Sequence, residues 1–182
     1  LLPQTNGWSR VTAAKTVRLE PGNYPDKPLV PLIGTVHDRL AIEVARGCTR
    51  GCRFCSAGIF YRPVRERPIG ELTGSLRRGI ENTGHTEVGL LSLSTADYRD
   101  LDGLFDGIAG VSAEHYCRVS LPSTRIDALT EAQFEALATL SGTSSFTIAP
   151  EAGSDRLRAV INKGFSNDDV MAMVRLLMTK NI

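Results

Sequence analysis

Residues 40–55 have the sequence LAIEVARGCTRGCRFC, in which a short apolar run leads directly into three closely spaced cysteines. The run from Leu40 to Val44 predicts a buried strand, because apolar runs of this length are typical of strands in a covered sheet. Cys48, Cys52 and Cys55 follow with the spacing C-x3-C-x2-C. The sequence therefore predicts a strand that ends in a loop of thiols.

Strands and helices are predicted to alternate after this loop. Helices are expected from about residue 69 to Gly84, over 101–108, after the capping pair Thr130 and Gln133, and after the capping pair Ser166 and Asp169. Strands are expected at 87–93, 117–121 and about 145–149. This alternation is typical of right-handed βαβ units around a parallel sheet. The predicted fold is an α/β partial parallel barrel with four βα units, whereas a complete eightfold barrel takes roughly 250 residues.

Residues 1–39 are predicted to form an extended, proline-rich N-terminal connector. They show no useful helix or strand period, and their prolines, such as Pro25, Pro28 and Pro31, disfavour helix. The sequence begins at Leu1 rather than at a methionine and stops after the fourth predicted unit. We therefore expect a piece of a longer protein, inactive by itself and prone to self-association through an unpaired sheet edge.

The three cysteines predict a metal site. Thiolates favour iron–sulfur clusters or zinc, and both kinds of site normally need four ligands. Only Cys48, Cys52 and Cys55 lie together, and no fourth cysteine follows nearby. A four-iron cluster held by three cysteines keeps one iron free for a ligand that is not protein.

The three thiols also have other interpretations. A structural zinc site typically uses two well-separated pairs of ligands, and no candidate fourth ligand has paired spacing: Cys117, His37, His85 and His115. A disulfide is less favoured, because clustered thiols without a signal peptide suit a reducing cytosol. A ferredoxin-like carrier would need its fourth cysteine in a recognisable place. Cys117 lies in an apolar-alternating stretch and is expected to be buried and inert.

The cysteine spacing, with the aromatic Phe54 directly before the third cysteine, resembles the radical S-adenosylmethionine (SAM) superfamily. The resemblance implies a [4Fe–4S] cluster whose open iron chelates the amino and carboxylate groups of SAM. It implies an enzyme that cleaves SAM reductively to a 5′-deoxyadenosyl radical, with an electron donor such as flavodoxin or ferredoxin. It also implies a partial barrel of six units, of which residues 40–182 would form the first two thirds.

The wider stretches 41–47 and 61–67 resemble more narrowly a group of uncharacterised radical SAM proteins associated with B12-binding domains. These proteins share features with methylthiotransferases. The resemblance therefore adds cobalamin as a further cofactor to consider. It would be held by a domain outside this chain, because the corrinoid pattern D-x-H-x-x-G does not occur in the sequence.

The resemblance places SAM contacts at the ends of predicted strands, where the loops of a parallel barrel converge. Ser92 and Ser94 occupy the place where many relatives have a Gly-Gly-Glu stretch that receives the SAM amino group, so this contact departs from the family pattern. Arg125 could clamp a carboxylate in bidentate fashion, either that of SAM or that of Asp127 or another acid.

Further contacts are implied near the end of the chain. Glu151 and Ser154 lie in an E-A-G-S stretch that resembles the family's E-S-G-S element. Glu151 would accept bonds from ribose hydroxyls or the SAM amino group, and Ser154 is also expected to cap a helix. Lys163 stands where relatives commonly have an arginine that binds the SAM carboxylate, and a lysine lacks the bidentate fork.

Composition is typical of a soluble globular protein, with 42% hydrophobic and 23% charged residues. No apolar run is long enough for a membrane span, and we expect a cytoplasmic location. The net charge is +1, but arginines surround the cysteines at positions 46, 50, 53, 62, 65 and 67. They would favour an anionic cluster and an unknown substrate such as RNA or another phosphate-bearing molecule, unless they pair with acids elsewhere. Two alternatives to an enzyme therefore stay open, a zinc-bound interaction module and an RNA-binding module that uses this arginine-rich rim.

Overall fold

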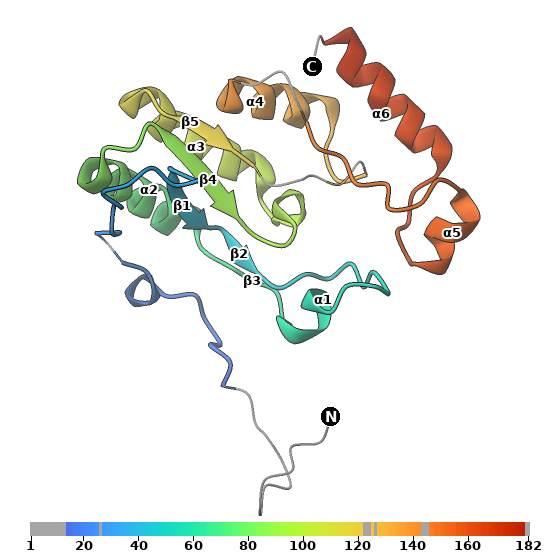
Figure 1. Ribbon diagram of the computed structural model, residues 1–182, viewed down its shortest axis with the longest axis horizontal. Helices are drawn as coiled ribbons and strands as arrows, with labels where there is room; N and C mark the ends of the chain where they lie inside the picture. The colour runs from blue at the N-terminus through green and yellow to red at the C-terminus, as the bar shows by residue number, and fades with distance from the viewer. Residues whose placement is uncertain (1–13, 26, 122–124, 126, 143–145, 181–182) are drawn as a thin grey trace, which may run out of the picture.

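A three-stranded parallel sheet forms the centre of the computed structural model, which describes residues 14–25, 27–121, 125, 127–142 and 146–180 (Figure 1). The strands are β1 (Leu40–Glu43), β4 (Glu87–Leu91) and β5 (Arg118–Ser120), in the order β1-β4-β5. Both neighbouring pairs are parallel. The predicted strands at 40–44, 87–93 and 117–121 are therefore confirmed, each slightly shorter than expected.

The two faces of the sheet differ in composition. Residues opposite each other in neighbouring strands share a face. One face carries apolar residues that are all buried: Leu40, Ile42, Val88, Leu90 and Val119. The other face carries Ala41, Glu43, Gly89, Leu91 and Ser120, of which Ala41 and Leu91 are exposed. A covered outer face and a more open inner face of this kind are consistent with a partial barrel.

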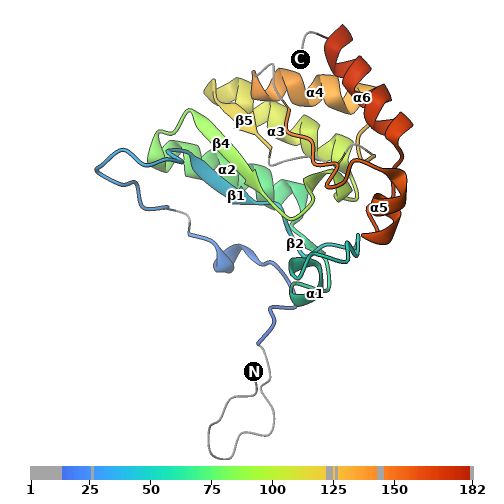
Figure 2. The same cartoon turned by 45° about the vertical axis from the view of Figure 1, so that its right-hand side comes forward.

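Three helices pack on the buried face: α2 (Ile69–Thr83), α3 (Leu101–His115) and α4 (Glu131–Ser141) (Figure 2). Leu72 and Leu76 of α2 lie in the core that this packing forms. As predicted, α2 ends at Gly84, which adopts a left-handed conformation with φ 71°. The predicted capping box of Thr130 and Gln133 begins α4. Local signals in the sequence thus set the ends of these helices.

The predicted strand at about 145–149 is not formed across the described part of that range. Ser145 lies outside the described residues, and within 146–150 only Ile148 forms a β-bridge. Phe146 and Ile148 instead pack against a second apolar cluster of Phe134, Phe165 and Met173. This packing satisfies the apolar alternation without a strand. The partial parallel barrel is therefore borne out, and the number of βα units stays a prediction.

Two helices follow this segment, α5 (Asp155–Val160) and α6 (Asn167–Thr179). The Ser154 hydroxyl accepts a hydrogen bond from the Leu157 amide and caps α5, and Ser166 and Asp169 form the predicted capping box of α6. Arg158 is almost completely buried and donates to the carbonyl oxygens of Ala152 (2.6 Å) and Phe165 (3.0 Å). This arginine holds the turns on both sides of α5 together.

Short elements that were not predicted lie around the cysteine loop. Strands β2 (Ala45–Arg46) and β3 (Arg65–Glu66) pair antiparallel, and helix α1 (Ala57–Phe60) lies between them in the sequence. Two 3₁₀ turns, η1 (Pro21–Asn23) and η2 (Thr95–Asp97), complete the described elements. Figure 1 shows β2, β3 and α1 beyond the carboxyl end of β1. The cysteine loop is therefore framed by structure of its own.

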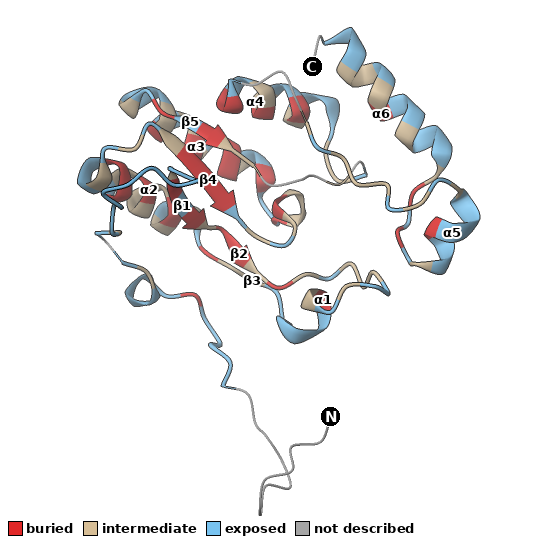
Figure 3. Cartoon of the chain, viewed as in Figure 1, coloured by how far each residue is buried: buried red, intermediate tan, exposed pale blue. Residues whose placement is uncertain are grey.

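The described part of the N-terminal segment is largely exposed (Figure 3), and one of its contacts with the edge of the sheet is made by Tyr24. Tyr24 donates a hydrogen bond to Glu43 Oε2 (2.7 Å), and its ring lies 3.9 Å from the Arg67 guanidinium. Burial and the bond to Glu43 raise the pKa of Tyr24 to about 12.

No helix in the described ranges is long and apolar enough to cross a membrane.

Candidate functional site

A pocket of about 200 Å³ brings the cysteine loop together with residues from four later places in the chain, 93–94, 125, 149–151 and 163. Its lining includes most of the predicted site residues: Cys48, Cys52, Phe54, Cys55, Ser94, Arg125, Glu151 and Lys163. Arg50, Leu93 and Ala149 complete the described lining. Residues up to 115 positions apart in sequence (Cys48 to Lys163) therefore share one small cavity.

The conformation of the cysteine loop depends on glycine. Gly47 has φ 97°, and a Cβ at this position would lie 2.6 Å from the Tyr61 carbonyl oxygen and 2.8 Å from that of Pro63. Gly51 has φ 68°. Residues that carry a side chain rarely adopt such positive φ values. Gly47 therefore allows the chain to turn directly before Cys48, and Gly51 allows it to turn between Cys48 and Cys52. The thiols of Cys48, Cys52 and Cys55 are free and partly exposed.

The donor set consists of three thiols, which are the ligands that iron–sulfur clusters use. Within the described ranges, no three Cys, His, Asp or Glu side chains are placed to hold one ion. A four-iron cluster spreads its thiolate ligands over separate irons, so its ligands need not converge on one point. The Arg50 amide lies 3.5 Å from Cys48 Sγ, and Arg125 Nη1 lies 4.0 Å from Cys52 Sγ. Such donors are the hydrogen-bonding surroundings that cluster sulfurs accept.

Asn162 fastens the segment before α6 to the cysteine loop, a role that the sequence analysis missed. Its amide Nδ2 donates to the carbonyl oxygens of Gly51 (2.9 Å) and Arg50 (3.3 Å). The Arg53 amide donates in turn to the Ile161 carbonyl oxygen at 3.0 Å. Asn162 has φ 58°, a conformation that asparagine tolerates better than most residues. The signal in the sequence that could have indicated this role is an asparagine followed by Lys-Gly.

Glu151 and Lys163 meet in the pocket as an ion pair. Lys163 Nζ lies 3.3 Å from Glu151 Oε1, and the lysine side chain is only 8% exposed. The same ammonium lies 5.9 Å from the centroid of the Phe54 ring. Glu151 adopts φ 66°, which is unusual for a residue with a side chain. The pair therefore places one positive and one negative charge in the pocket that the thiols line.

Arg125 is already engaged by an acid, as one of the sequence alternatives stated. Its Nε and Nη2 donate to the two carboxylate oxygens of Asp127 at 2.9 and 2.7 Å. Nη2 also donates to the Lys163 carbonyl oxygen at 2.9 Å. The bidentate fork that could have held the carboxylate of SAM is therefore occupied by Asp127.

Arg50 forms a second clamped pair. Its Nε lies 2.9 and 2.8 Å from the two carboxylate oxygens of Asp97, and its Nη1 lies 3.6 Å from Asp127 Oδ2. The hydrogen bond to Asp97 raises the pKa of the Arg50 guanidinium. Burial alone would raise the pKa of Asp97, but the bonds from Arg50 and Ser94 hold it below its usual value. Asp97 was not predicted as a site residue, because its partner Arg50 lies far away in the sequence, and Asp127 was named only as one possible partner of Arg125.

Two predicted contacts lie outside this pocket. Ser92 lines a different cavity, and its hydroxyl is 2.6 Å from that of Thr95. Ser154 caps α5, which is the structural role that the sequence offered for it. Cys117 is buried in the main core, and burial raises the pKa of its thiol. The prediction that Cys117 is a buried thiol apart from the other three is therefore confirmed.

The arginine-rich rim is mostly used in internal contacts. Arg46 makes two bonds of 2.7 and 2.6 Å to the Glu43 carboxylate, and Arg65 donates to the carbonyl oxygens of Thr16, Tyr61 and Pro63. Arg67 is 1% exposed. Guanidinium groups bound in this way are poorly placed to contact phosphates. The structure therefore gives little support to an RNA-binding surface built from this rim.

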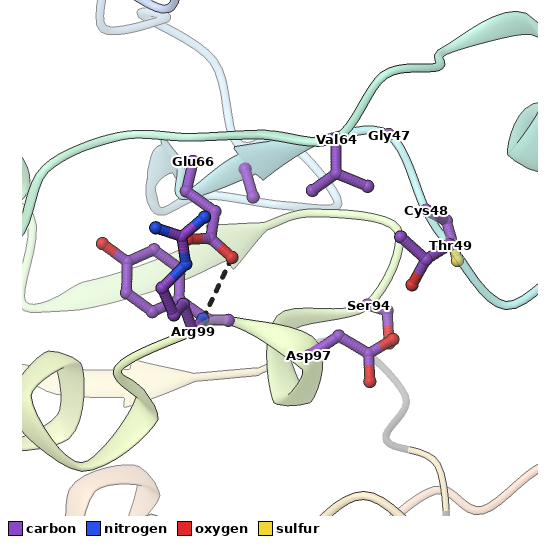
Figure 4. Close-up of a pocket in the computed structure, with 10 residues that line it drawn as sticks. Gly47, Cys48, Thr49, Val64, Glu66, Ser94, Asp97 and Arg99 are labelled. Atoms are coloured by element: carbon purple, nitrogen blue, oxygen red, sulfur yellow. Dashed lines mark hydrogen bonds between the residues drawn. The ribbon is translucent and has the colours of Figure 1, made fainter.

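A larger pocket of about 520 Å³ adjoins the first and shares Cys48 and Ser94 with it. Figure 4 shows it between the β2–β3 pair and the loop that follows β4. Cys48 lies at one end, and Glu66 and Arg99 lie at the other, where the Arg99 amide donates to Glu66 Oε1 at 3.0 Å. The thiol loop therefore has open space on more than one side.

The fold and the site together define a class of protein: a partial parallel α/β barrel with a three-thiol loop beyond the carboxyl end of its first strand. The chain belongs to the radical SAM superfamily, whose family model matches residues 42–182. The cofactors of this superfamily are a [4Fe–4S] cluster and SAM, as the sequence predicted.

Individual relatives cover a similar part of the chain. An uncharacterized protein of Methanocaldococcus jannaschii is 32% identical over 135 residues, which are 74% of this chain and 29% of the relative. The threonylcarbamoyladenosine tRNA methylthiotransferase MtaB of Treponema pallidum is 27% identical over 76% of this chain and 29% of its own length. The present chain thus spans less than a third of these relatives.

A solved structure shows the same fold. The radical SAM methyltransferase TsrM from Kitasatospora setae, with cobalamin and a [4Fe–4S] cluster bound, superposes with a TM-score of 0.62. The match covers 79% of this chain and 29% of TsrM at 12% sequence identity. The predicted type of partial barrel is therefore confirmed by structure as well as by sequence.

Proposed function

We propose that this chain forms the cofactor-binding part of a radical SAM enzyme, in which Cys48, Cys52 and Cys55 ligate a [4Fe–4S] cluster and SAM binds beside it. The observation that carries the proposal is the convergence of the three thiols with Glu151 and Lys163 in one pocket. When bound and reduced, the cluster supplies the electron that cleaves SAM to methionine and a 5′-deoxyadenosyl radical. The protein's own task is to hold, orient and shield the cofactors.

The Glu151–Lys163 pair suits the amino-acid end of SAM, which presents an amino group and a carboxylate. Glu151 would accept a hydrogen bond from the amino N–H in place of Lys163, and Lys163 would donate to the carboxylate in place of Glu151. Each protein group would exchange one hydrogen-bond partner for another, so neither would be left unpaired in a partly buried pocket. Phe54, Ser94 and the backbone around Leu93 would line the same space.

The whole protein's reaction is a broader proposal. The tRNA-modifying relative supports RNA, or another phosphate-bearing molecule, as the substrate class. The cobalamin in TsrM supports cobalamin as a further cofactor, bound by a domain outside this chain. An electron donor such as flavodoxin or ferredoxin would reduce the cluster, and free, partly exposed thiols suit the reducing cytoplasm.

The test is anaerobic reconstitution of the full-length gene product with iron and sulfide. We expect about four irons per chain and a brown protein. Serine at Cys48, Cys52 or Cys55 should abolish this loading, whereas Cys117→Ser, a thiol buried in the main core, is the matched control and should retain it. Zinc in place of iron, or loss of iron in Cys117→Ser, would contradict the proposal.

A further inference from the structure

Arg125 is held at three points, and together they fix where its remaining nitrogen points. The Asp127 carboxylate accepts hydrogen bonds from Nε and Nη2 of Arg125, and the Lys163 carbonyl oxygen also accepts one from Nη2. The guanidinium carbon lies 5.6 Å from the centroid of the Phe165 ring, within the range of a cation–π contact. The side chain is 13% exposed. This arginine has little freedom to turn toward a ligand.

The remaining nitrogen, Nη1, points to Cys52. It lies 4.0 Å from Cys52 Sγ, and Nη1 makes no other described hydrogen bond. A guanidinium at this distance places a positive charge beside a thiolate and offers it a hydrogen-bond donor. The position of Nη1 beside a cluster ligand, together with the engagement of Nε and Nη2 by Asp127, argues against a role as a clamp for the SAM carboxylate.

Charges of alternating sign continue from Arg125 across the cysteine loop. Asp127 contacts both Arg125 and Arg50, and Arg50 is clamped by Asp97. The backbone amide of Arg50 lies 3.5 Å from Cys48 Sγ. Two thiols therefore have positively charged residues beside them, and the position of each guanidinium is fixed by an aspartate behind it.

We propose that Arg125, positioned by Asp127, sets the reduction potential of the cluster held by Cys48, Cys52 and Cys55, and does not bind SAM. This inference rests on the proposed function, because it requires the cluster to be present. In the step concerned, a low-potential one-electron donor transfers one electron to the oxidised [4Fe–4S]²⁺ cluster and gives [4Fe–4S]⁺. No bond to a cysteine forms or breaks, so the only change is one added negative charge.

The sign of the effect follows from this added charge. A fixed positive group beside Cys52 stabilises the reduced cluster more than the oxidised one, and so raises the reduction potential. Removing the guanidinium lowers the potential. Removing the negative charge of Asp127 raises it, provided that Arg125 stays in place. Asparagine at position 127 keeps one oxygen acceptor, and the Lys163 carbonyl oxygen continues to hold Nη2.

The experiment poises the reconstituted full-length gene product at fixed potentials with dithionite and mediators, without SAM, and measures the reduced cluster by electron paramagnetic resonance. At one fixed potential, Arg125→Gln should lower the ratio of reduced to oxidised cluster about tenfold, or about 59 mV for a one-electron couple. Asp127→Asn should shift this ratio in the opposite direction, and the double variant should return toward the wild-type value. Arg77→Gln, which removes a surface pair with Glu114 far along α2, is the matched control and should leave it unchanged.

The outcomes separate the two proposals. A wild-type protein without a four-iron cluster overturns the proposed function and this inference together. A cluster whose potential does not move in Arg125→Gln overturns the inference alone, as do shifts of the same sign in both single variants, which a loosened loop would give. SAM affinity, measured by equilibrium dialysis, should change less than threefold in Arg125→Gln. A tenfold loss of SAM affinity in Arg125→Gln, with the reduction potential unchanged, would indicate instead that Arg125 binds the SAM carboxylate.

Discussion

Replacing Gly47 with alanine should destabilise the cysteine loop and displace Cys48. The new Cβ would lie 2.6 Å from the Tyr61 carbonyl oxygen, 2.8 Å from that of Pro63 and 3.0 Å from Val64 Cα. All three are backbone atoms, so no flexible side chain can move aside. The backbone at residue 47 also has φ 97°, which is unfavourable for alanine.

The magnitude of this change can be worked from two separate costs. A residue with a Cβ in a left-handed conformation costs about 1–2 kcal/mol, and overpacking typically costs about 1–3 kcal/mol. Gly47→Ala should therefore lower the free energy of unfolding by about 2–5 kcal/mol. Gly84 offers a matched control, because it has φ 71° and nothing within 4 Å of its Cβ position. Gly84→Ala should show only the first cost, about 1–2 kcal/mol.

The assay is urea unfolding followed by circular dichroism, together with iron content after reconstitution. Gly47→Ala should lose more stability than Gly84→Ala and should also bind less iron, since residue 47 directly precedes Cys48. Gly84→Ala should bind iron like the wild type. Equal losses of stability in the two variants, or full iron content in Gly47→Ala, would refute the steric argument.

Two further predictions concern the ligand pocket and the sheet edge. Glu151→Ala and Lys163→Ala should each weaken SAM binding about tenfold or more at unchanged iron content, because hydrogen bonds to charged groups contribute about 1.5–3 kcal/mol; unchanged dissociation constants in equilibrium dialysis would place SAM elsewhere. Tyr24, whose pKa is raised to about 12 by burial and by Glu43, should stabilise the fold fully below pH 10 and lose this contribution as the pH rises through 12. The measurement is the ultraviolet difference titration between wild type and Tyr24→Phe, over the pH range in which circular dichroism shows an intact fold. We expect Tyr24 to ionise well above pH 10. Ionisation of Tyr24 near pH 10 would contradict the prediction.

Local signals in the sequence predicted a large part of the fold. The strand that begins at Leu40, the left-handed end of α2 at Gly84 and the capping box at Thr130 all depend on residues close to one another in the chain. Hydrophobic pattern and capping chemistry determine such features. The expected strand is reduced to a bridge at Ile148 within 146–149, because Phe146 and Ile148 pack against the cluster around Phe134 and Phe165. That choice depends on helices α4 and α6, which no local pattern identifies as partners.

The candidate site also combines residues that a local motif indicates with residues whose partners no local motif identifies. The three cysteines and Glu151 stand out in the sequence because their motifs are local and chemically specific, and the structure brings them into one pocket. The role of Arg125 was not predictable, because the sequence cannot say which of several acids an arginine meets, and Asp127 meets it here. Strands β2 and β3 are two residues each, and they pair residues 45–46 with 65–66 across the cysteine loop. No periodicity can show in so few residues.

The attachment of Asn162 to the cysteine loop has a thermodynamic consequence. The amide of Asn162 holds the carbonyl oxygens of Arg50 and Gly51, and the next residue along the chain is Lys163. Cluster ligation would fix the loop, and SAM binding would fix the segment that carries Lys163, so each event would prepare the conformation that the other requires. Linkage makes such an effect reciprocal: if the cluster tightens SAM binding by some factor, SAM must lower the equilibrium dissociation constant of the cluster by the same factor. At a given chelator concentration, protein saturated with SAM should then retain more iron at equilibrium than protein without SAM.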